Sequence, residues 1–153
     1  MKRGIMAEGW TKITAAWKGD MNFIGENEAG GQVQMGTLNN VPGVGPMQLL
    51  LVGMAGCTGM DIVSILQKKK IELVDFKVEI EAMKNDTYPM IWTDINVMYL
   101  LWGESIKTKD VEQAIQLSEE KYCSVSIMLG KSARIKSDYR ILKPGETIDT
   151  RSN

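Results

Sequence analysis

Histidine is absent from this chain of 153 residues. Its absence excludes the Ser-His-Asp and Cys-His arrangements, in which an imidazole activates the nucleophile. It also excludes every zinc or iron site built on histidine ligands. Any catalysis must therefore use thiols, carboxylates, lysine or arginine side chains, or backbone dipoles.

Cysteine is scarce, and the chain contains only Cys57 and Cys123. Two cysteines are too few for a disulfide scaffold, and these two lie too far apart in sequence for a C-x-x-C motif. No apolar signal segment follows Lys2 and Arg3, so we expect the reducing cytoplasm. A cysteine pair there is more often catalytic or redox-active than structural. The alternative is a pair of inert thiols buried as small apolar side chains.

The chain has no excess of charge of either sign, because its formal net charge is −1. It therefore lacks an electrostatic reason to bind nucleic acid or an anionic membrane. A composition of 44% hydrophobic and 24% charged residues is typical of a soluble globular domain. The length predicts one domain over residues 1–153, with a core at about 9–142 and a polar tail at 143–153.

Long apolar runs are also rare, and residues 45–70 contain the longest one. Between Leu49 and Leu66, apolar side chains cover every side of a helical wheel, which is typical of a buried or membrane-spanning helix. The run is long enough to cross a bilayer. However, Asp61 near its centre would cost about 2.5–3.5 kcal/mol on membrane insertion. We therefore expect a helix buried in protein and no membrane span.

The ends of this helix are marked by Pro46, which suits a first helical position, and by Lys68 to Lys70, which suit a last turn. Three glycines inside the helix each lower its stability by about 1 kcal/mol relative to alanine. They would allow a second helix to approach closely, or they would simply kink the helix beside Cys57. These glycines are Gly53, Gly56 and Gly59.

Segments of alternating polarity predict strands on both sides of the helix. Before it, three strands are expected at about 9–18, 21–24 and 32–36, with turns at 19–20 and 25–31 and a loop at 39–45. After it, residues 72–82 and 91–102 are expected to pair antiparallel through a turn at 85–87. The better-buried face of the second of these strands is expected to be Ile91, Ile95, Val97, Tyr99 and Leu101.

A second helix is expected from an N-cap at Thr108 to Tyr122, with Cys123 at its end. Its inward stripe is Val111, Ala114, Ile115, Ser118 and Tyr122, and a last strand covers 133–141. The predicted order is βββ-α-ββ-α-β, an α+β fold of antiparallel sheets packed on helices.

Three segments resemble the OsmC (osmotically inducible protein C) family. They are Pro46 to Leu50, Gly56 to Asp61, and Glu120 to Ser126. The family pattern has a P-x-E-L-L-like helix start, a first cysteine a few turns later and a second cysteine in a C-x-x-S motif. The resemblance covers roughly residues 9–142 and is closer to the general OsmC-like subgroup than to the organic hydroperoxide resistance proteins.

The resemblance implies an intertwined homodimer with active sites at the interface, in which sheets are completed by the partner and wrap around two crossing helices. It also implies reduction of small apolar organic hydroperoxides, with Cys57 as the peroxidatic thiolate and Cys123 as the resolving thiol. No bound cofactor is implied, since an external dithiol such as lipoamide would reduce the resulting disulfide.

Two activating groups of the family's peroxidases are replaced in this chain. The glutamate of the helix start falls on Gln48, and no arginine occurs between Arg3 and Arg134. The nearest base at the expected turn is Lys18, which cannot form the bidentate contact of a guanidinium group. Lys18, Gln48 and Glu120 are therefore candidates for thiol activation or orientation.

Asp61 follows Cys57 by one helical turn on the same face. It is a candidate for orienting a proton near the sulfur. Alternatively, it caps a helix break after Gly59 or forms a pair across the dimer.

Two further functions stay open at this stage. The first is a member without peroxidase activity, either a stress protein or a protein that binds a small apolar ligand in the same cleft. The second is a structural disulfide or an inert thiol pair. A disulfide requires the Cα atoms of Cys57 and Cys123 to lie within about 7 Å of each other.

Overall fold

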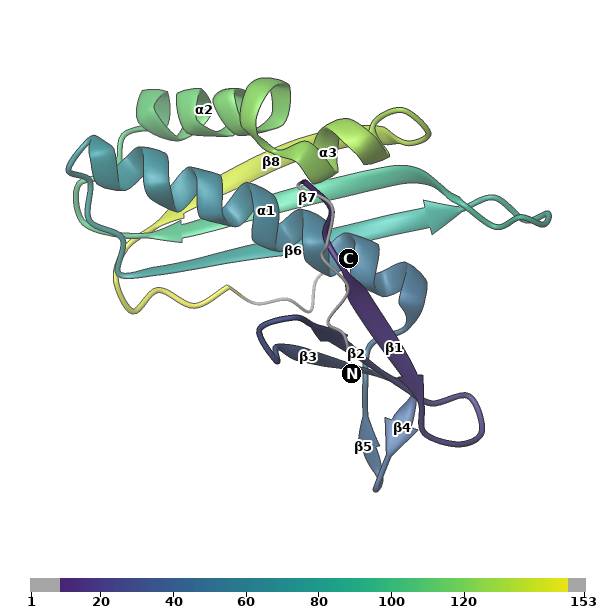
Figure 1. The fold of residues 1–153 in the computed structure, drawn as a ribbon. Helices are drawn as coiled ribbons and strands as arrows, with labels where there is room; N and C mark the ends of the chain where they lie inside the picture. Colours follow the sequence, from purple (N-terminus) through teal and green to yellow (C-terminus); the bar gives the residue numbers. More distant parts are fainter. Residues whose placement is uncertain (1–8, 149–153) are drawn as a thin grey trace. The chain divides into compact units, whose positions relative to one another are not determined.

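The computed structural model describes residues 9–148, which divide into two compact units between Leu49 and Leu50. The first unit contains five short strands and the beginning of α1 (Pro46–Lys68). The second contains the rest of α1, a three-stranded sheet and the remaining helices (Figure 1). The mixed α+β class is as predicted, while the assignment of the whole chain to one domain stays a prediction.

The first unit is built on an antiparallel meander of β1 (Ile13–Trp17), β2 (Phe23–Asn27) and β3 (Gln32–Met35). The predicted turn at 25–31 is shorter than expected, because β2 continues to Asn27. The Asn27 side chain holds that turn by accepting hydrogen bonds from the backbone N–H groups of Ala29 (3.0 Å) and Gly31 (2.8 Å). Every residue of β1 is exposed. The expected half-buried strand is therefore not covered by any described part of the chain.

A small hairpin of β4 (Thr37–Leu38) and β5 (Val41–Pro42) replaces part of the loop predicted at 39–45. Asn39 and Asn40 have φ values of 51° and 62°, as in the tight turns that twist with a hairpin. Gly43 then packs so closely on the backbone of Gln34 that a Cβ atom would overlap it. This position therefore requires glycine.

The second unit contains a sheet of β6 (Asp75–Lys84), β7 (Trp92–Trp102) and β8 (Arg134–Leu142) in the order β6-β7-β8. β6 and β7 pair antiparallel, as predicted from their alternating sequences. β8 pairs parallel with β7, so the expectation of purely antiparallel sheets is wrong. The connection between β7 and β8 consists of helices, and such a crossover returns the chain to the same end of the sheet.

The helices of this unit lie on one face of its sheet (Figure 1). Their core contacts join α1, β7 and α2 (Thr108–Leu117). The side chains predicted to face inward from β7 are buried, except that Ile91 is exposed just before the strand. The central buried residues are Met54, Ile62 and Leu66 of α1, Ile95, Val97, Tyr99 and Leu101 of β7, and Val111, Ala114 and Ile115 of α2.

The range of the predicted second helix contains two helical segments, and a third follows Cys123. α2 is followed by a π-helical turn, η1 (Ser118–Tyr122), and then by α3 (Ser124–Leu129). The N-cap of α2 is Lys107, so the prediction of Thr108 as the cap is wrong. Tyr122 is also placed incorrectly by the prediction, because it is 50% exposed, whereas the other predicted inward residues are buried. A π turn adds one residue per turn and rotates the following side chain away from the stripe.

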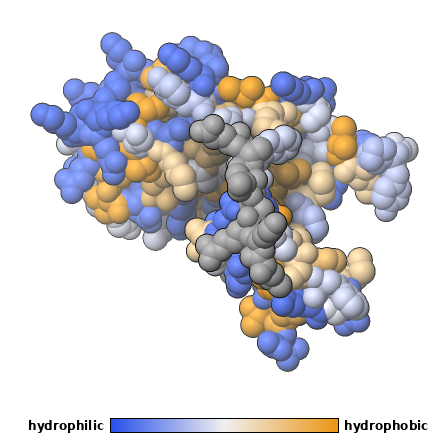
Figure 2. Space-filling view, viewed as in Figure 1, coloured by the Kyte–Doolittle hydropathy of each residue, from blue (hydrophilic) through white to orange (hydrophobic). Residues whose placement is uncertain are grey.

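α1 is continuous, and it buries only one of its faces in the described chain. The buried residues are Met54, Thr58, Gly59, Ile62 and Leu66, while Met60 is 75% exposed. In Figure 2, orange and tan atoms occur along the path of α1, whereas α2 is covered mostly by hydrophilic residues. The burial predicted for α1 therefore holds for one of its faces only. The helix also has the length and hydropathy of a membrane span, two properties that core helices of soluble proteins share.

We expect Met54→Ala to lower the free energy of unfolding by about 2–5 kcal/mol, because Met54 is fully buried and its removal leaves a cavity. Met128→Ala is the matched control, since Met128 lies on a helix but is exposed. Urea unfolding followed by circular dichroism measures both. A loss below 1 kcal/mol in Met54→Ala would contradict the core described above.

Candidate functional site

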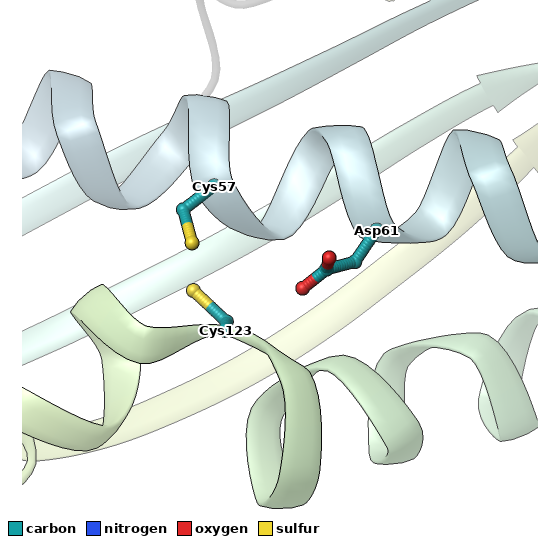
Figure 3. Close-up of side chains that lie close together, drawn as sticks. All are labelled: Cys57, Asp61 and Cys123. Atoms are coloured by element: carbon teal, nitrogen blue, oxygen red, sulfur yellow. The ribbon is translucent and has the colours of Figure 1, made fainter. Parts of the chain in front are cut away.

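Cys57 and Cys123 face each other in the second unit. Their sulfur atoms and a carboxylate oxygen of Asp61 all lie within 4.8 Å of one another. Cys57 and Asp61 project from successive turns of α1, and Cys123 faces them from the junction of η1 and α3 (Figure 3). Both cysteines are free thiols. The predicted pair and the predicted carboxylate therefore form one cluster.

This cluster bears on the question of distance left by the sequence. The two sulfurs lie within 4.8 Å of each other, whereas a disulfide has a sulfur–sulfur bond of about 2.0 Å, so the free thiols must move together to form one. The continuous course of α1 also excludes one role considered for Asp61, because there is no helix break after Gly59 for it to cap.

The two thiols differ in accessibility. Cys57 is partly exposed, whereas Cys123 has no exposed surface. Gly56, next to Cys57, has no side chain of its own, and a Cβ atom placed there would meet no other described residue within 4 Å. A small reagent therefore reaches Cys57 more easily than Cys123.

Burial raises the pKa of the Cys123 thiol above its usual value. The Ser126 hydroxyl (3.0 Å) and backbone N–H (3.4 Å) donate hydrogen bonds to its sulfur and oppose this effect, while the facing Cys57 thiol adds to it. Burial is the largest of these effects, so Cys123 keeps its proton at neutral pH. Ser126 is placed to stabilise the thiolate when that proton leaves.

Behind Asp61 lies a group of buried hydroxyls. The Ser118 hydroxyl donates to Asp61 Oδ2 (3.0 Å), and Thr58 Oγ1 lies 2.8 Å from both Ser118 Oγ and the Tyr99 hydroxyl. Tyr99 in turn donates to Glu119 Oε1 (3.2 Å). Burial raises the pKa of Tyr99 well above its usual value, Thr58 opposes this, and Glu119 adds to it, so Tyr99 remains a neutral phenol.

The sequence prediction missed these hydroxyls as functional groups. Ser118 was assigned to the inward stripe of a helix, and Tyr99 to the apolar face of a strand. The signal in the sequence that could have identified these residues is a hydroxyl at a position predicted to face inward. Such a hydroxyl needs a hydrogen-bond partner once it is buried. Identifying the partners required knowledge of which helix packs on which strand.

The other candidate residues are engaged elsewhere. Glu120 is exposed and accepts from the Gln116 amide (3.3 and 3.4 Å), so it is not part of the cluster. The Gln48 side chain accepts from the Gly45 N–H (2.8 Å) at the start of α1. The exposed Lys18 lies between β1 and β2 and lines a hollow on the first unit's sheet with Lys12 and Glu26. The roles of Lys18 and Gln48 toward Cys57 stay predictions.

The cluster also contains three side chains that can act as metal ligands, namely two thiols and a carboxylate. Among the described residues the group has three such side chains, one fewer than a structural zinc site uses. Cys123 and Asp61 already accept hydrogen bonds from Ser126 and Ser118. The arrangement therefore suits thiol chemistry better than a structural metal site.

Several known proteins resemble this chain in sequence or in fold. Residues 38–138 match the family model described as OsmC-like protein. Protein YhfA of Escherichia coli strain K12 is 34% identical over 126 residues, which cover 82% of this chain and 94% of YhfA.

Two solved structures illustrate the range of similarity. A hypothetical protein from Aquifex aeolicus VF5 is 30% identical, with a TM-score of 0.79 over 88% of this chain and 97% of the other. The organic hydroperoxide resistance protein OhrB of Bacillus subtilis is 18% identical, with a TM-score of 0.58 over 88% of this chain and 100% of its own. This second match shows a shared fold.

We expect N-ethylmaleimide to label Cys57 well before Cys123 in the folded, reduced protein. The labelling rate of Cys123 should rise with pH and stay below half of its plateau at pH 9.0, the usual thiol pKa, because burial raises the pKa of Cys123. Ser126→Ala should shift it further, since the hydroxyl that stabilises the thiolate is lost. Mass spectrometry of quenched peptides measures both rates, and equal labelling at neutral pH would contradict the assignment.

Proposed function

The chain belongs to the OsmC-like family, and we propose that it reduces organic hydroperoxides with Cys57 and Cys123. The observation that carries the proposal is the contact of two free thiols, one accessible and one buried, beside a carboxyl group. Support also comes from the structural neighbours of this chain that are named organic hydroperoxide resistance proteins.

The proposed oxidation begins at Cys57. Its thiolate attacks the terminal oxygen of the hydroperoxide, an S–O bond forms and the O–O bond breaks. Cys57 becomes a sulfenic acid, and the leaving alkoxide takes one proton to become an alcohol. The sulfur is oxidised by two electrons, and the peroxide is reduced by two.

Cys123 completes the cycle as the resolving thiol. Its sulfur attacks the Cys57 sulfur, a disulfide forms, and hydroxide leaves as water with the proton that Cys123 gives up. An external dithiol then reduces the disulfide through a mixed disulfide and is itself oxidised. This supply of reducing equivalents fits a reducing compartment, which we take to be the cytoplasm.

The environments of the two thiols suit these roles. The peroxidatic thiol must meet substrate, and Cys57 is the accessible member of the pair. The resolving thiol must escape direct oxidation, and Cys123 is buried and retains its proton. The Ser126 hydroxyl would stabilise the sulfur of Cys123 as it ionises for attack.

We further propose that the protein acts as a homodimer. β1 is exposed on both faces, and α1 exposes apolar residues such as Val52 and Met60. A Cβ atom at Gly53 or Gly56 would meet no other atom within 4 Å, so these glycines face open space in the single chain. A second α1 crossing there would cover this face, and the partner's sheet would cover β1.

A purified sample should consume cumene hydroperoxide when supplied with a dithiol such as dihydrolipoamide. We expect Cys57→Ser to fall to the uncatalysed rate, because no other described thiol is accessible. Cys123→Ser should still form a sulfenic acid, which dimedone traps and mass spectrometry detects. The absence of hydroperoxide consumption by the wild type would contradict the proposed activity.

That negative result would favour the second candidate function, a stress or ligand-binding protein that holds a small apolar molecule. One observation supports it: Gln48, at the position of the family's activating glutamate, has its side-chain oxygen committed to the Gly45 N–H. Gln48 therefore holds the helix start through this oxygen, and it lacks the negative charge of the glutamate.

Gly53→Leu tests the crossing of two α1 helices. In a monomer the new side chain would meet open space and would raise the helix propensity by about 1 kcal/mol. In the proposed dimer it would separate the two helices, so we expect dissociation at concentrations where the wild type is dimeric. Lys109→Leu, at an exposed position of α2 away from that face, is the control. Sedimentation equilibrium measures the masses, and a monomeric wild type would contradict the dimer.

A further inference from the structure

The two thiols and Asp61 form a set of potential metal ligands, here called the Cys57–Asp61–Cys123 cluster. Their side chains point toward one another from α1 and from the η1–α3 junction (Figure 3). Thiolate ligands favour Zn²⁺ and similar soft ions, whereas Mg²⁺ and Ca²⁺ take oxygen ligands. Because Zn²⁺ accepts both sulfur and carboxylate oxygen, the donor set of this cluster suits zinc.

The spacing of the cluster also suits zinc. With Zn–S bonds of about 2.3 Å and a Zn–O bond of about 2.1 Å, a tetrahedral site separates its two sulfurs by about 3.8 Å and each sulfur from the oxygen by about 3.6 Å. In this structure all three ligand atoms lie within 4.8 Å of one another. A zinc ion therefore requires the sulfurs to approach less closely than a disulfide does, whose bond is about 2.0 Å long.

Hydrogen bonds from two serines hold the ligands and leave room for an ion. The Ser118 hydroxyl donates to Asp61 Oδ2 (3.0 Å), so the other carboxylate oxygen stays available. Ser126 donates to the Cys123 sulfur through its hydroxyl (3.0 Å) and its backbone N–H (3.4 Å). A thiolate has three lone pairs, so one of them remains for the ion. Such outer hydrogen bonds orient the ligands of metal sites in proteins.

The exposure of the cluster gives an ion a way in. Cys57 and Asp61 are partly exposed, whereas Cys123 is fully buried on the interior side. Three protein ligands are also the number found in open zinc sites, in which water takes the fourth position. An ion held in this way exchanges with solvent, in contrast to the closed four-ligand sites that stabilise a fold.

We propose that the Cys57–Asp61–Cys123 cluster binds one zinc ion per chain and that this ion reversibly blocks the thiol pair. Two S–Zn bonds form as both thiols release their protons to solvent, and the Asp61 carboxylate adds the third bond. No electron is transferred. The Cys57 sulfur then has its reactive lone pair on the metal, and a disulfide cannot form until the ion leaves. Zinc binding itself does not depend on the proposed peroxidase function.

Titration of the reduced protein with Cd²⁺ without oxygen tests the site, because cadmium–thiolate bonds absorb in the ultraviolet. The wild type should bind one ion per chain, and added Zn²⁺ should remove the absorption by competition. Cys57→Ser and Cys123→Ser should each lose at least half of the absorption. The Kd for Zn²⁺, measured against a chromogenic chelator, should rise at least about 10-fold in Asp61→Asn and about 10-fold in Ser118→Ala.

Glu120→Gln is the matched control for Asp61→Asn. Glu120 is an exposed carboxyl group that accepts from Gln116 and lies outside the cluster, so its loss should leave the Kd unchanged. The absence of one-to-one binding, an unchanged Kd in Asp61→Asn or an equal loss of affinity in Glu120→Gln would overturn the proposal. Cys57→Ser, at a partly exposed position, keeps the test available where Cys123→Ser fails to fold.

Alkylation tests the block and separates this inference from the proposed function. Saturating Zn²⁺ should slow the reaction of Cys57 with N-ethylmaleimide at least about 10-fold, because a metal-bound thiolate is a weaker nucleophile, and EDTA should restore the rate. An unchanged rate with zinc bound would overturn the block. An inactive wild type that binds zinc would overturn the peroxidase function alone, whereas an active wild type without zinc binding would overturn this inference alone.

Discussion

The need to satisfy buried hydroxyls positions the candidate site. Thr58 of α1, Tyr99 of β7 and Ser118 at the start of η1 meet in the interior, where each lies within 2.8 Å of a partner. Thr58 is the residue after Cys57, and the Ser118 carbonyl accepts the N–H of Cys123 (2.7 Å). The contact between Thr58 and Ser118 therefore holds the two segments that carry the thiols. An unsatisfied hydroxyl would cost as much as several apolar contacts, so the spacing of the thiols follows from the polar core.

Local patterns in the sequence predict the elements of the fold well where one face of an element is buried and the other is wet. The alternation in β6 and β7 gave their antiparallel pairing and the buried face of β7. The same reasoning failed for β8, because strand direction depends on the path of the connecting helices. It also failed for β1, since an alternating strand need not find its cover within its own chain. The π turn was hidden because its residues are ordinary helix formers.

The sequence predicted only part of the candidate site, because local patterns reveal some of its residues and not others. Cysteine is rare here, so both thiols stood out, and helical spacing placed Asp61 beside Cys57. Thr58, Ser118 and Tyr99 did not stand out, because small polar residues and tyrosine are common in helix and strand interiors. Their function depends on contacts between α1, β7 and η1, and no local pattern contains them. The positions of Lys18 and Gln48 toward the thiols likewise depend on packing beyond the second unit.

The absence of histidine, and of arginine between Arg3 and Arg134, changes how such a site can handle charge. A guanidinium group beside a thiol stabilises the thiolate and so favours the attacking group. In the described part of this chain, the hydroxyl and the backbone N–H of Ser126 donate to the sulfur of Cys123. These neutral donors favour a thiolate at Cys123 without bringing a positive charge into the interior, where an isolated cation would be costly to desolvate.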